Sequence, residues 1–348
     1  MSDGSAYTSE QQFAPIIRFA IPLGKRHGLV FRFVSVDKAQ LLSAYQLRGF
    51  AALGLKLGFR TPPDQATAMP TRLFSLAKEA GAKALVFDGD DDQAILWPDI
   101  LGLCDGYIKK HGFSDLQTYQ KTFIGKSNLT DYTARSFNIP FADDIIPACG
   151  AVDSSHITRM VVGWNIALDD KIYELAQVIP PAPTNEKTID VLCRASLAED
   201  FWIFPMREAA VRAIQKLAHR YEVSAPRARV SQEAYYREMV SFRIFVSPFG
   251  CGELCWRDFE SILAGALLAK PDMSHLTTLP DLFVAGETYA PVAWDYSDLE
   301  EVCSRYLDDE PLRQKIALQA RRRLISALSE DWFLERFADV MDRFDVGR

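Results

Sequence analysis

The segment of residues 247–260 contains groups that are suited to holding a phosphate ester. Gly250 and Gly252 lack side chains, so a turn formed there brings backbone amides close to a ligand. The apolar pattern predicts a strand that ends at Ser247 and a helix that follows the turn. Because the N-terminus of a helix attracts anions, the segment predicts a phosphate site built from a strand, a turn and a helix.

Charged side chains in the same segment favour a nucleotide as the ligand. At about 3.6 residues per turn, a helix here places Glu253, Arg257 and Glu260 within about 60° of one another. A guanidinium offers a planar fork of donors to phosphate oxygens, and a carboxylate accepts hydrogen bonds from two vicinal hydroxyls. We expect Arg257 to neutralise a diphosphate and Glu260 to bind ribose hydroxyls. A ladder of salt bridges along an exposed helix face is the alternative.

Two further arginines are expected to reach the same site. Arg194 ends the first predicted strand of the second half, and Arg207 lies in the first turn of the next predicted helix. Both positions face the edge of a parallel sheet at which ligands bind. For each arginine, a surface salt bridge is the alternative.

Both halves of the chain alternate predicted strands with predicted helices. Strands are predicted at residues 29–36, 83–87, 106–108, 188–193, 221–223 and 243–247. Helices are predicted at residues 37–57, 72–80, 205–219, 232–239 and from 299 onwards. This order predicts an α/β protein with two parallel, doubly wound sheets, that is, two Rossmann-like domains that face each other across a cleft.

The segment 247–260 reads Ser-Pro-x-Gly-x-Gly-x-x-Cys-x-Arg-x-x-Glu without a gap. It resembles the nucleotide-sugar signature of GT-B glycosyltransferases, and most closely that of the exostosin-like group. The resemblance implies transfer of a sugar from a nucleoside-diphosphate sugar to a hydroxyl of a glycan or glycolipid. Glu253 and Glu260 are separated by six residues, which departs from the E-x7-E spacing of many retaining relatives. The stereochemical outcome therefore stays open.

The length of 348 residues leaves room for two domains of roughly 150 residues each. A proline-rich polar stretch at residues 179–185 has the composition of a linker. We expect a Rossmann-like acceptor domain at residues 1–180 and a nucleotide-sugar domain at residues 181–330. Residues 331–348 are expected to form a helix that packs back on the first domain.

The first half is expected to supply the base that takes the proton of the acceptor hydroxyl. Asp88, Asp90 and His111 are the candidates, since each follows a predicted strand. Asp88 and Asp90 also match the Asp-x-Asp pattern with which GT-A enzymes hold a divalent metal. The donor-like segment in the second half leaves no task for such a metal, so we expect a metal-independent enzyme. Its co-substrate is the nucleotide sugar, with no further cofactor.

Composition restricts the partners and the compartment. A net charge of −7 and a pI near 5.4 argue against a nucleic-acid binder. Six cysteines and an N-terminus without a signal-like run indicate reduced thiols, so we expect a cytoplasmic protein. Cys251, Cys255 and His275 lack a fourth ligand for zinc. No apolar run approaches the roughly 20 residues of a membrane span, which leaves only peripheral contact at the inner membrane surface.

Two alternatives to a transferase stay open at this stage. One is a sugar-nucleotide-binding protein without catalysis, because the base is not fixed by the sequence. The other is a GT-B-like epimerase that acts on the nucleotide sugar itself and needs no acceptor.

Overall fold

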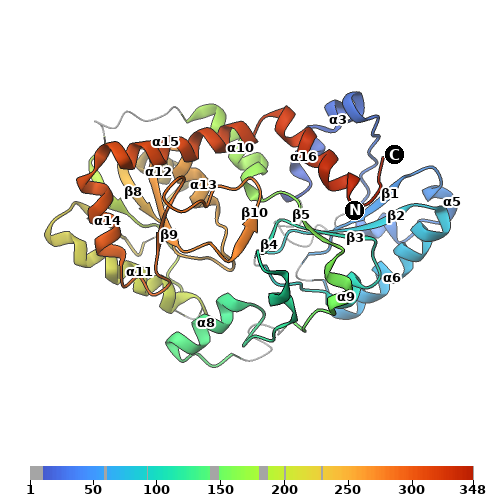
Figure 1. Ribbon diagram of the computed structural model, residues 1–348, viewed down its shortest axis with the longest axis horizontal. Coiled ribbons are helices and arrows are strands. Elements are labelled where there is room, and N and C mark those ends of the chain that lie inside the picture. Colours follow the sequence, from blue (N-terminus) through green and yellow to red (C-terminus); the bar gives the residue numbers. More distant parts are fainter. Residues whose placement is uncertain are drawn as a thin grey trace.

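The computed structural model describes residues 11–58, 61–91, 93–141, 149–179, 187–199, 201–228 and 230–347. It contains one parallel sheet in each half of the chain, with helices packed around both (Figure 1). The first sheet has the order β1 (Ala52–Leu55), β2 (Lys83–Asp88), β3 (Gly106–Lys109) and β5 (Met160–Val162). The second has the order β11 (Ala290–Val292), β9 (Leu267–Pro271), β8 (Phe242–Val246), β6 (Ile189–Leu192) and β7 (Val223–Ser224).

Every neighbouring pair of strands in the two larger sheets is parallel, which confirms the predicted α/β class with two Rossmann-like domains. The helices of the first half are α2 (Ala14–Arg18), α3 (Ala20–His27), α4 (Val36–Ala39), α5 (Ala44–Leu47), α6 (Pro63–Ala80), α7 (Pro98–Leu101), α8 (Asn128–Phe137), α9 (Ser154–Ile157) and α10 (Asp170–Val178). Those of the second half are α11 (Phe204–Lys216), α12 (Gln232–Met239), α13 (Trp256–Leu263), α14 (Leu299–Asp308), α15 (Glu310–Ala327) and α16 (Glu330–Asp342).

The strand predicted at residues 29–36 and the helix predicted at 37–57 are wrong. Residues 28–34 form no ladder, and the following stretch holds the short helices α4 and α5 and then strand β1. Ser43 begins a new helix with a capping box, and Gly49 has a φ of +83°, which a helix does not tolerate. Of the apolar side chains at 29–33, Phe31 packs against Phe337 (5.8 Å between ring centroids), whereas Val30 and Phe33 stay exposed.

A small antiparallel ladder joins the two halves. Strand β4 (His111–Phe113) follows β3, and its partner β10 (Leu276–Thr278) follows β9. Asn165 reinforces this connection, because its side-chain amide donates to Thr278 Oγ1 at 2.6 Å and to Pro280 O at 3.1 Å. Both sheets therefore turn their carboxyl ends toward the same interdomain region. The predicted linker lies almost wholly outside the described residues, since only Ile179 of it is described.

The chain ends by returning to the first half. Helix α16 packs beside α3, as Figure 1 shows in red and blue. Phe333 is fully buried, with its ring centroid 5.1 Å from that of Trp164. The Arg336 Nε donates to Gly163 O at 3.1 Å. Within the described residues, no helix has both the length and the apolar character that crossing a membrane requires.

We predict that Phe333→Ala destabilises the protein by roughly 3–5 kcal/mol, because it removes a buried ring and leaves a cavity. Urea unfolding followed by tryptophan fluorescence measures the loss. Glu335→Ala on the same helix is the control, since its ion pair with Arg26 (3.4 Å) is exposed and contributes at most about 1 kcal/mol. Equal effects of the two substitutions would show that α16 is not packed as described.

Candidate functional site

A cleft of about 450 Å³ lies between the two halves. This volume falls within the range of roughly 300–1,000 Å³ that is usual for small-molecule sites. Both halves contribute side chains to it. The lining residues are Gln11, Asp91, Ile166, Lys171, Arg194, Tyr235, Cys251, Gly252, Leu254, Cys255, Trp256, Arg257 and Glu260.

The strand order of the second sheet explains the position of this cleft. Strand β6 comes first in the chain and lies between β7 and β8, so the winding direction changes between β6 and β8. In doubly wound sheets, ligands bind outside the carboxyl ends of the strands at such a switch point. Arg194 follows the end of β6, and Ser247 follows the end of β8. The predicted phosphate segment therefore begins where the topology places a ligand.

The turn at residues 250–252 is tight. Gly250 N donates to Gly252 O at 2.9 Å. A Cβ on residue 250 would lie 2.9 Å from Cys255 Sγ, so a side chain there would displace the Cys255 thiol. Gly252 lines the cleft directly. The small residues thus let the backbone approach the space that a ligand would fill.

Glu253 does not lie on the helix, and its predicted common face with Arg257 and Glu260 is wrong. Helix α13 begins at Trp256, after Cys255, whose N–H donates to Asp258 Oδ2 at 2.9 Å. The helix capped at Cys255 therefore starts three residues beyond Glu253. The carboxylate of Glu253 is fully buried and points toward the interdomain ladder instead of the cleft lining.

Arg207 and Arg257 are held by neutral acceptors. The Arg257 Nε donates to Ser247 Oγ at 3.0 Å, and its Nη2 donates to Pro248 O. The Arg207 Nε donates to Phe249 O at 3.0 Å, and its Nη1 donates to Ser196 O at 2.9 Å. Among the described residues, neither guanidinium has a carboxylate oxygen within ion-pairing distance.

The two guanidinium groups also act on each other. Burial lowers the pKa of Arg207, and repulsion by the charge of Arg257 lowers it further. Two like charges without carboxylates between them produce a positive potential at the glycine turn. An anion that bridges them would relieve the repulsion and gain charge-assisted hydrogen bonds. Arg257 lines the cleft, whereas Arg207 adjoins the glycine turn and is not among the lining residues.

Glu260 lies one turn after Arg257 on α13, lines the same cleft and is almost fully buried. Its Oε1 is 2.7 Å from Lys171 Nζ, and its Oε2 accepts from the Tyr235 hydroxyl at 2.9 Å. The sequence did not single out Lys171 or Tyr235, although both line the cleft. Lys171 also lies over the ring of Trp256, 4.6 Å from its centroid.

Arg194 forms a salt bridge, which was the alternative interpretation of this residue. Its Nε and Nη2 donate to the two carboxylate oxygens of Glu238 at 2.7 and 2.8 Å. The side chain lines the cleft but is already neutralised. Its contribution to ligand binding stays a prediction, with less charge available than at Arg207.

Asp258, Lys270 and Ser247 form a buried polar cluster next to the glycine turn. Lys270 Nζ lies 3.1 Å from Asp258 Oδ2, and both side chains are fully buried. Asp258 also accepts from the Ser247 hydroxyl. Ser247, which was expected to touch the donor, is thus fully buried and holds Arg257 in place. The sequence could have identified Asp258 as a capping residue, because an acidic side chain three positions after the N-cap often binds the N-cap amide.

The structure places Asp88 and Asp90 at the end of β2, as the sequence indicated. Asp88 accepts from Lys109 Nζ at 2.8 Å and from the Tyr107 hydroxyl at 2.7 Å. Burial alone would raise the pKa of Asp88, but Lys109 and Tyr107 outweigh it and lower the pKa to about 2. Asp90 donates its N–H to Asp88 Oδ1 at 3.0 Å and lies 4.0 Å from Lys126 Nζ. Neither carboxylate is among the residues that line the cleft.

His111 is brought together with Glu253 and His275. Glu253 Oε2 is 3.7 Å from His111 Nε2, and Glu253 Oε1 is 3.6 Å from His275 Nε2. His111 and Glu253 are fully buried, and His275 is partly exposed. Burial lowers the pKa of His111, which favours the neutral imidazole. His111 is more than 140 positions from Glu253 and His275, so no local pattern predicts this contact.

Within the described part of the chain, no group of three His, Cys, Asp or Glu side chains is arranged to hold a metal ion. Cys251 and Cys255 are free thiols beside the glycine turn.

Comparison with known proteins adds similarities of overall structure. No protein-family model and no curated protein matches the chain. A glycosyltransferase from Rickettsia africae is similar with a TM-score of 0.49 and 12% identity, over 95% of this chain and 93% of that one. HepE of Anabaena, solved with UDP and glucose, gives 0.46 and 10%, over 98% and 97%.

TarM is similar with a TM-score of 0.44 and 10% identity, over 83% of this chain. The matched region is 54% of TarM, so the chain spans about half the length of that protein. Because these similarities are low, the function proposed below rests on the chain's own site.

We predict that the Asp88–Lys109 pair makes stability depend on pH. The pKa of Asp88 is lowered to about 2, so the pair contributes about 2.5 kcal/mol of stability above pH 4. This contribution is lost as the pH falls toward 2. Roughly 1 kcal/mol of it should be gone at pH 3. Urea unfolding at pH 6 and pH 3 measures this. The double variant Asp88→Asn/Lys109→Met should lose less stability over the same interval; an unchanged pH dependence would contradict the assignment.

Proposed function

We propose that the chain transfers a sugar from a nucleoside-diphosphate sugar to a hydroxyl of a glycan or glycolipid. The observation that carries this proposal is the pair Arg207 and Arg257, which has no carboxylate partner among the described residues and adjoins the glycine turn. A diphosphate supplies the negative charge that this pair lacks. The resemblance of residues 247–260 to the exostosin-like GT-B signature supports the same ligand.

In this proposal the donor lies along the start of α13. Arg257 and the backbone of Cys251 and Gly252 line the cleft and hold the diphosphate, and Arg207 reaches it from beside Gly250. Glu260 accepts hydrogen bonds from the ribose hydroxyls. An ionised carboxylate has about four lone-pair sites, so Glu260 retains acceptor capacity beside its bonds to Lys171 and Tyr235. Lys171 and Tyr235 fix the orientation of that carboxylate.

The same arginines serve the chemical step. As the bond between the sugar and the diphosphate breaks, negative charge grows on the leaving group. Fixed guanidinium groups stabilise that charge without reorganising, and the mutual repulsion of Arg207 and Arg257 falls as the charge develops. We propose that this step proceeds without a metal ion.

Of the three base candidates, His111 is the one that we favour. Asp88 is occupied by Lys109, and its lowered pKa makes it a weak base. The imidazole of His111 is favoured in its neutral form, and Glu253 lies near its Nε2. Its Nδ1 has no hydrogen-bond partner in the described structure and is therefore able to accept a proton. Contact with an acceptor requires the surrounding interdomain region to open, because His111 is fully buried.

That burial also favours a second candidate function. With Asp88 paired and His111 buried, the cleft suits a protein that binds a sugar nucleotide without turning it over. Such a protein would have the same donor site as the proposed transferase but would not catalyse sugar transfer.

We predict that Arg207→Gln, Arg257→Gln and Glu260→Gln each weaken binding of the best-bound nucleoside diphosphate at least about tenfold, since each loses a charge-assisted hydrogen bond. Isothermal titration calorimetry with UDP, GDP and ADP measures this. Arg212→Gln is the matched control on α11, because Arg212 is exposed and, among the described residues, pairs with Glu208. If all four variants bind as the wild type does, the diphosphate site is misplaced.

We predict that His111→Gln lowers the turnover of the donor by about 10² or more while its dissociation constant stays the same, because only proton transfer is lost. Release of nucleoside diphosphate, measured by chromatography with and without EDTA, is the assay. Wild-type turnover should survive EDTA. No release by the wild-type protein with any acceptor would favour the binding protein, and full turnover by His111→Gln would exclude His111 as the base.

A further inference from the structure

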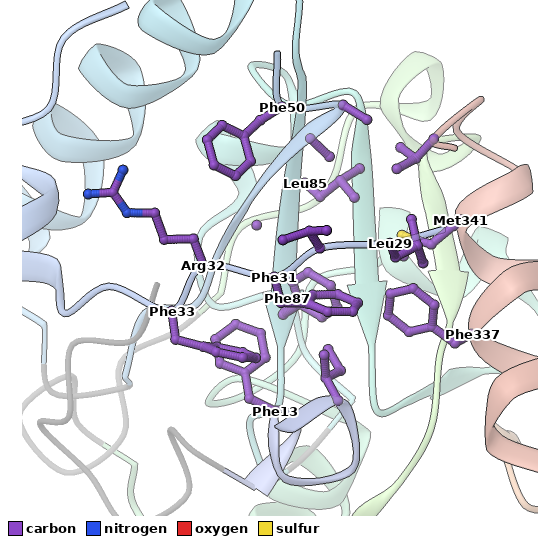
Figure 2. Close-up of a pocket in the computed structure, with 16 residues that line it drawn as sticks. Phe13, Leu29, Phe31, Arg32, Phe33, Phe50, Leu85, Phe87, Phe337 and Met341 are labelled. Atoms are coloured by element: carbon purple, nitrogen blue, oxygen red, sulfur yellow. The ribbon is translucent and has the colours of Figure 1, made fainter. Parts of the chain in front are cut away.

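A second, apolar pocket of about 180 Å³ lies in the first half of the chain (Figure 2). It is formed by the first sheet, the segment 29–33 and helix α16, and it shares no lining residue with the cleft. Figure 2 shows the rings of Phe13, Phe31, Phe87 and Phe337 gathered at one side of it. The lining residues are Phe13, Ile16, Leu29, Val30, Phe31, Arg32, Phe33, Phe50, Ala51, Ala52, Gly54, Leu85, Phe87, Phe337, Met341 and Val346.

The lining favours an apolar occupant. Apart from Arg32, every lining side chain is apolar. Water in such a space finds few hydrogen-bond partners, so an apolar group replaces it with a gain in free energy. Gly54 leaves room for the ring of Phe87 in the pocket lining, because a Cβ there would lie 2.8 Å from that ring. A methylene group is about as large as a water molecule, which occupies about 30 Å³. The pocket therefore holds a hydrocarbon segment of roughly six methylene groups.

The rim of the pocket is apolar and exposed, with one charge. Val30 is 86% exposed and Phe33 is 48% exposed. Exposed apolar side chains that cluster around a concave site mark a site of binding. Arg32 is exposed and lies in the rim, and Figure 2 shows its side chain extending away from the rings. Within the described residues it has no ion-pair partner.

The surrounding sequence is basic although the chain as a whole is acidic. Residues 25–48 contain five Lys or Arg residues and a single Asp, whereas the net charge of the chain is −7. One of the five, Arg26, is already paired with Asp331 and Glu335 of α16. Basic side chains beside exposed apolar ones are the combination that attracts anionic amphiphiles. A folded partner protein would need about 800 Å² of its surface buried, which a narrow concavity of this volume does not provide.

We propose that this pocket binds the hydrocarbon chain of an anionic amphiphile, whose acidic headgroup pairs with Arg32. Resting on the transferase function proposed above, this amphiphile is a lipid-linked acceptor. Gln11 lines the cleft and Phe13 lines the pocket, so the two sites are only two residues apart along the chain. Two residues span at most about 7 Å, so parts of the two linings lie close together, as a lipid-linked acceptor requires.

The test measures binding of decyl phosphate, below its micelle concentration, by isothermal titration calorimetry. The wild-type protein should bind decyl phosphate and should not bind inorganic phosphate at the same concentration. Ala52→Phe fills the pocket, and Val30→Asp places a negative charge at its exposed rim. Each should weaken binding at least about tenfold, as should Arg32→Glu, which reverses the charge that meets the headgroup.

Arg322→Glu is the matched control, because it is an exposed arginine of α15 outside the pocket. Nucleoside diphosphate binding should be unchanged in all four variants, so failure of the pocket is distinguishable from failure of the donor site. The proposal is overturned if the wild-type protein does not bind decyl phosphate. It is equally overturned if Ala52→Phe and Val30→Asp bind decyl phosphate as tightly as Arg322→Glu does.

Discussion

The candidate site depends on the buried ion pair between Asp258 and Lys270. Two charges without access to water cost several kcal/mol each unless they are closely paired and hydrogen-bonded. Asp258 meets that requirement by accepting from Lys270, from the Ser247 hydroxyl and from the backbone N–H that starts α13. The pair therefore joins the end of β9 to the end of β8 and to the start of the helix. The glycine turn and the arginines are positioned by this one arrangement.

The local parts of this arrangement were predictable from sequence. Short apolar runs identified β2, β3, β6 and β8, and the helices after residue 204 were found because their apolar stripes have a period near 3.6. The pattern at 247–260 located the turn, and Arg257 and Glu260 do line the cleft. These features follow from neighbouring residues, whose preferences the sequence states directly. The prediction of a strand at residues 29–36 was wrong because it took an apolar run as a sign of burial, whereas the side chains at 29–34 are only half-buried or exposed and several of them line a pocket.

The contacts between distant segments were not predictable. Lys171 and Glu260 are 89 positions apart in the chain, and His111 meets Glu253 only because β4 pairs with β10. No periodicity records such pairings. Glu253 was wrongly placed on the helix face of Arg257 and Glu260. Its spacing fits such a helix, but the capping box with Asp258 starts the helix only at Trp256. The candidate donor groups were thus found locally, whereas their partners required the fold.

The proposed function requires the cleft to recognise two phosphates between a ribose and a sugar. Thermal unfolding of the wild-type protein with UDP-, GDP- and ADP-sugars and with a CMP-sugar tests this requirement, because a ligand that binds the folded state raises the unfolding temperature. The CMP-sugar carries a single phosphate and cannot bridge Arg207 and Arg257 in the same way. We expect the unfolding temperature to rise with at least one of the diphosphate sugars and to stay unchanged with the CMP-sugar. A rise with the CMP-sugar alone, or no rise with any sugar nucleotide, would show that the cleft is not a diphosphate-sugar site.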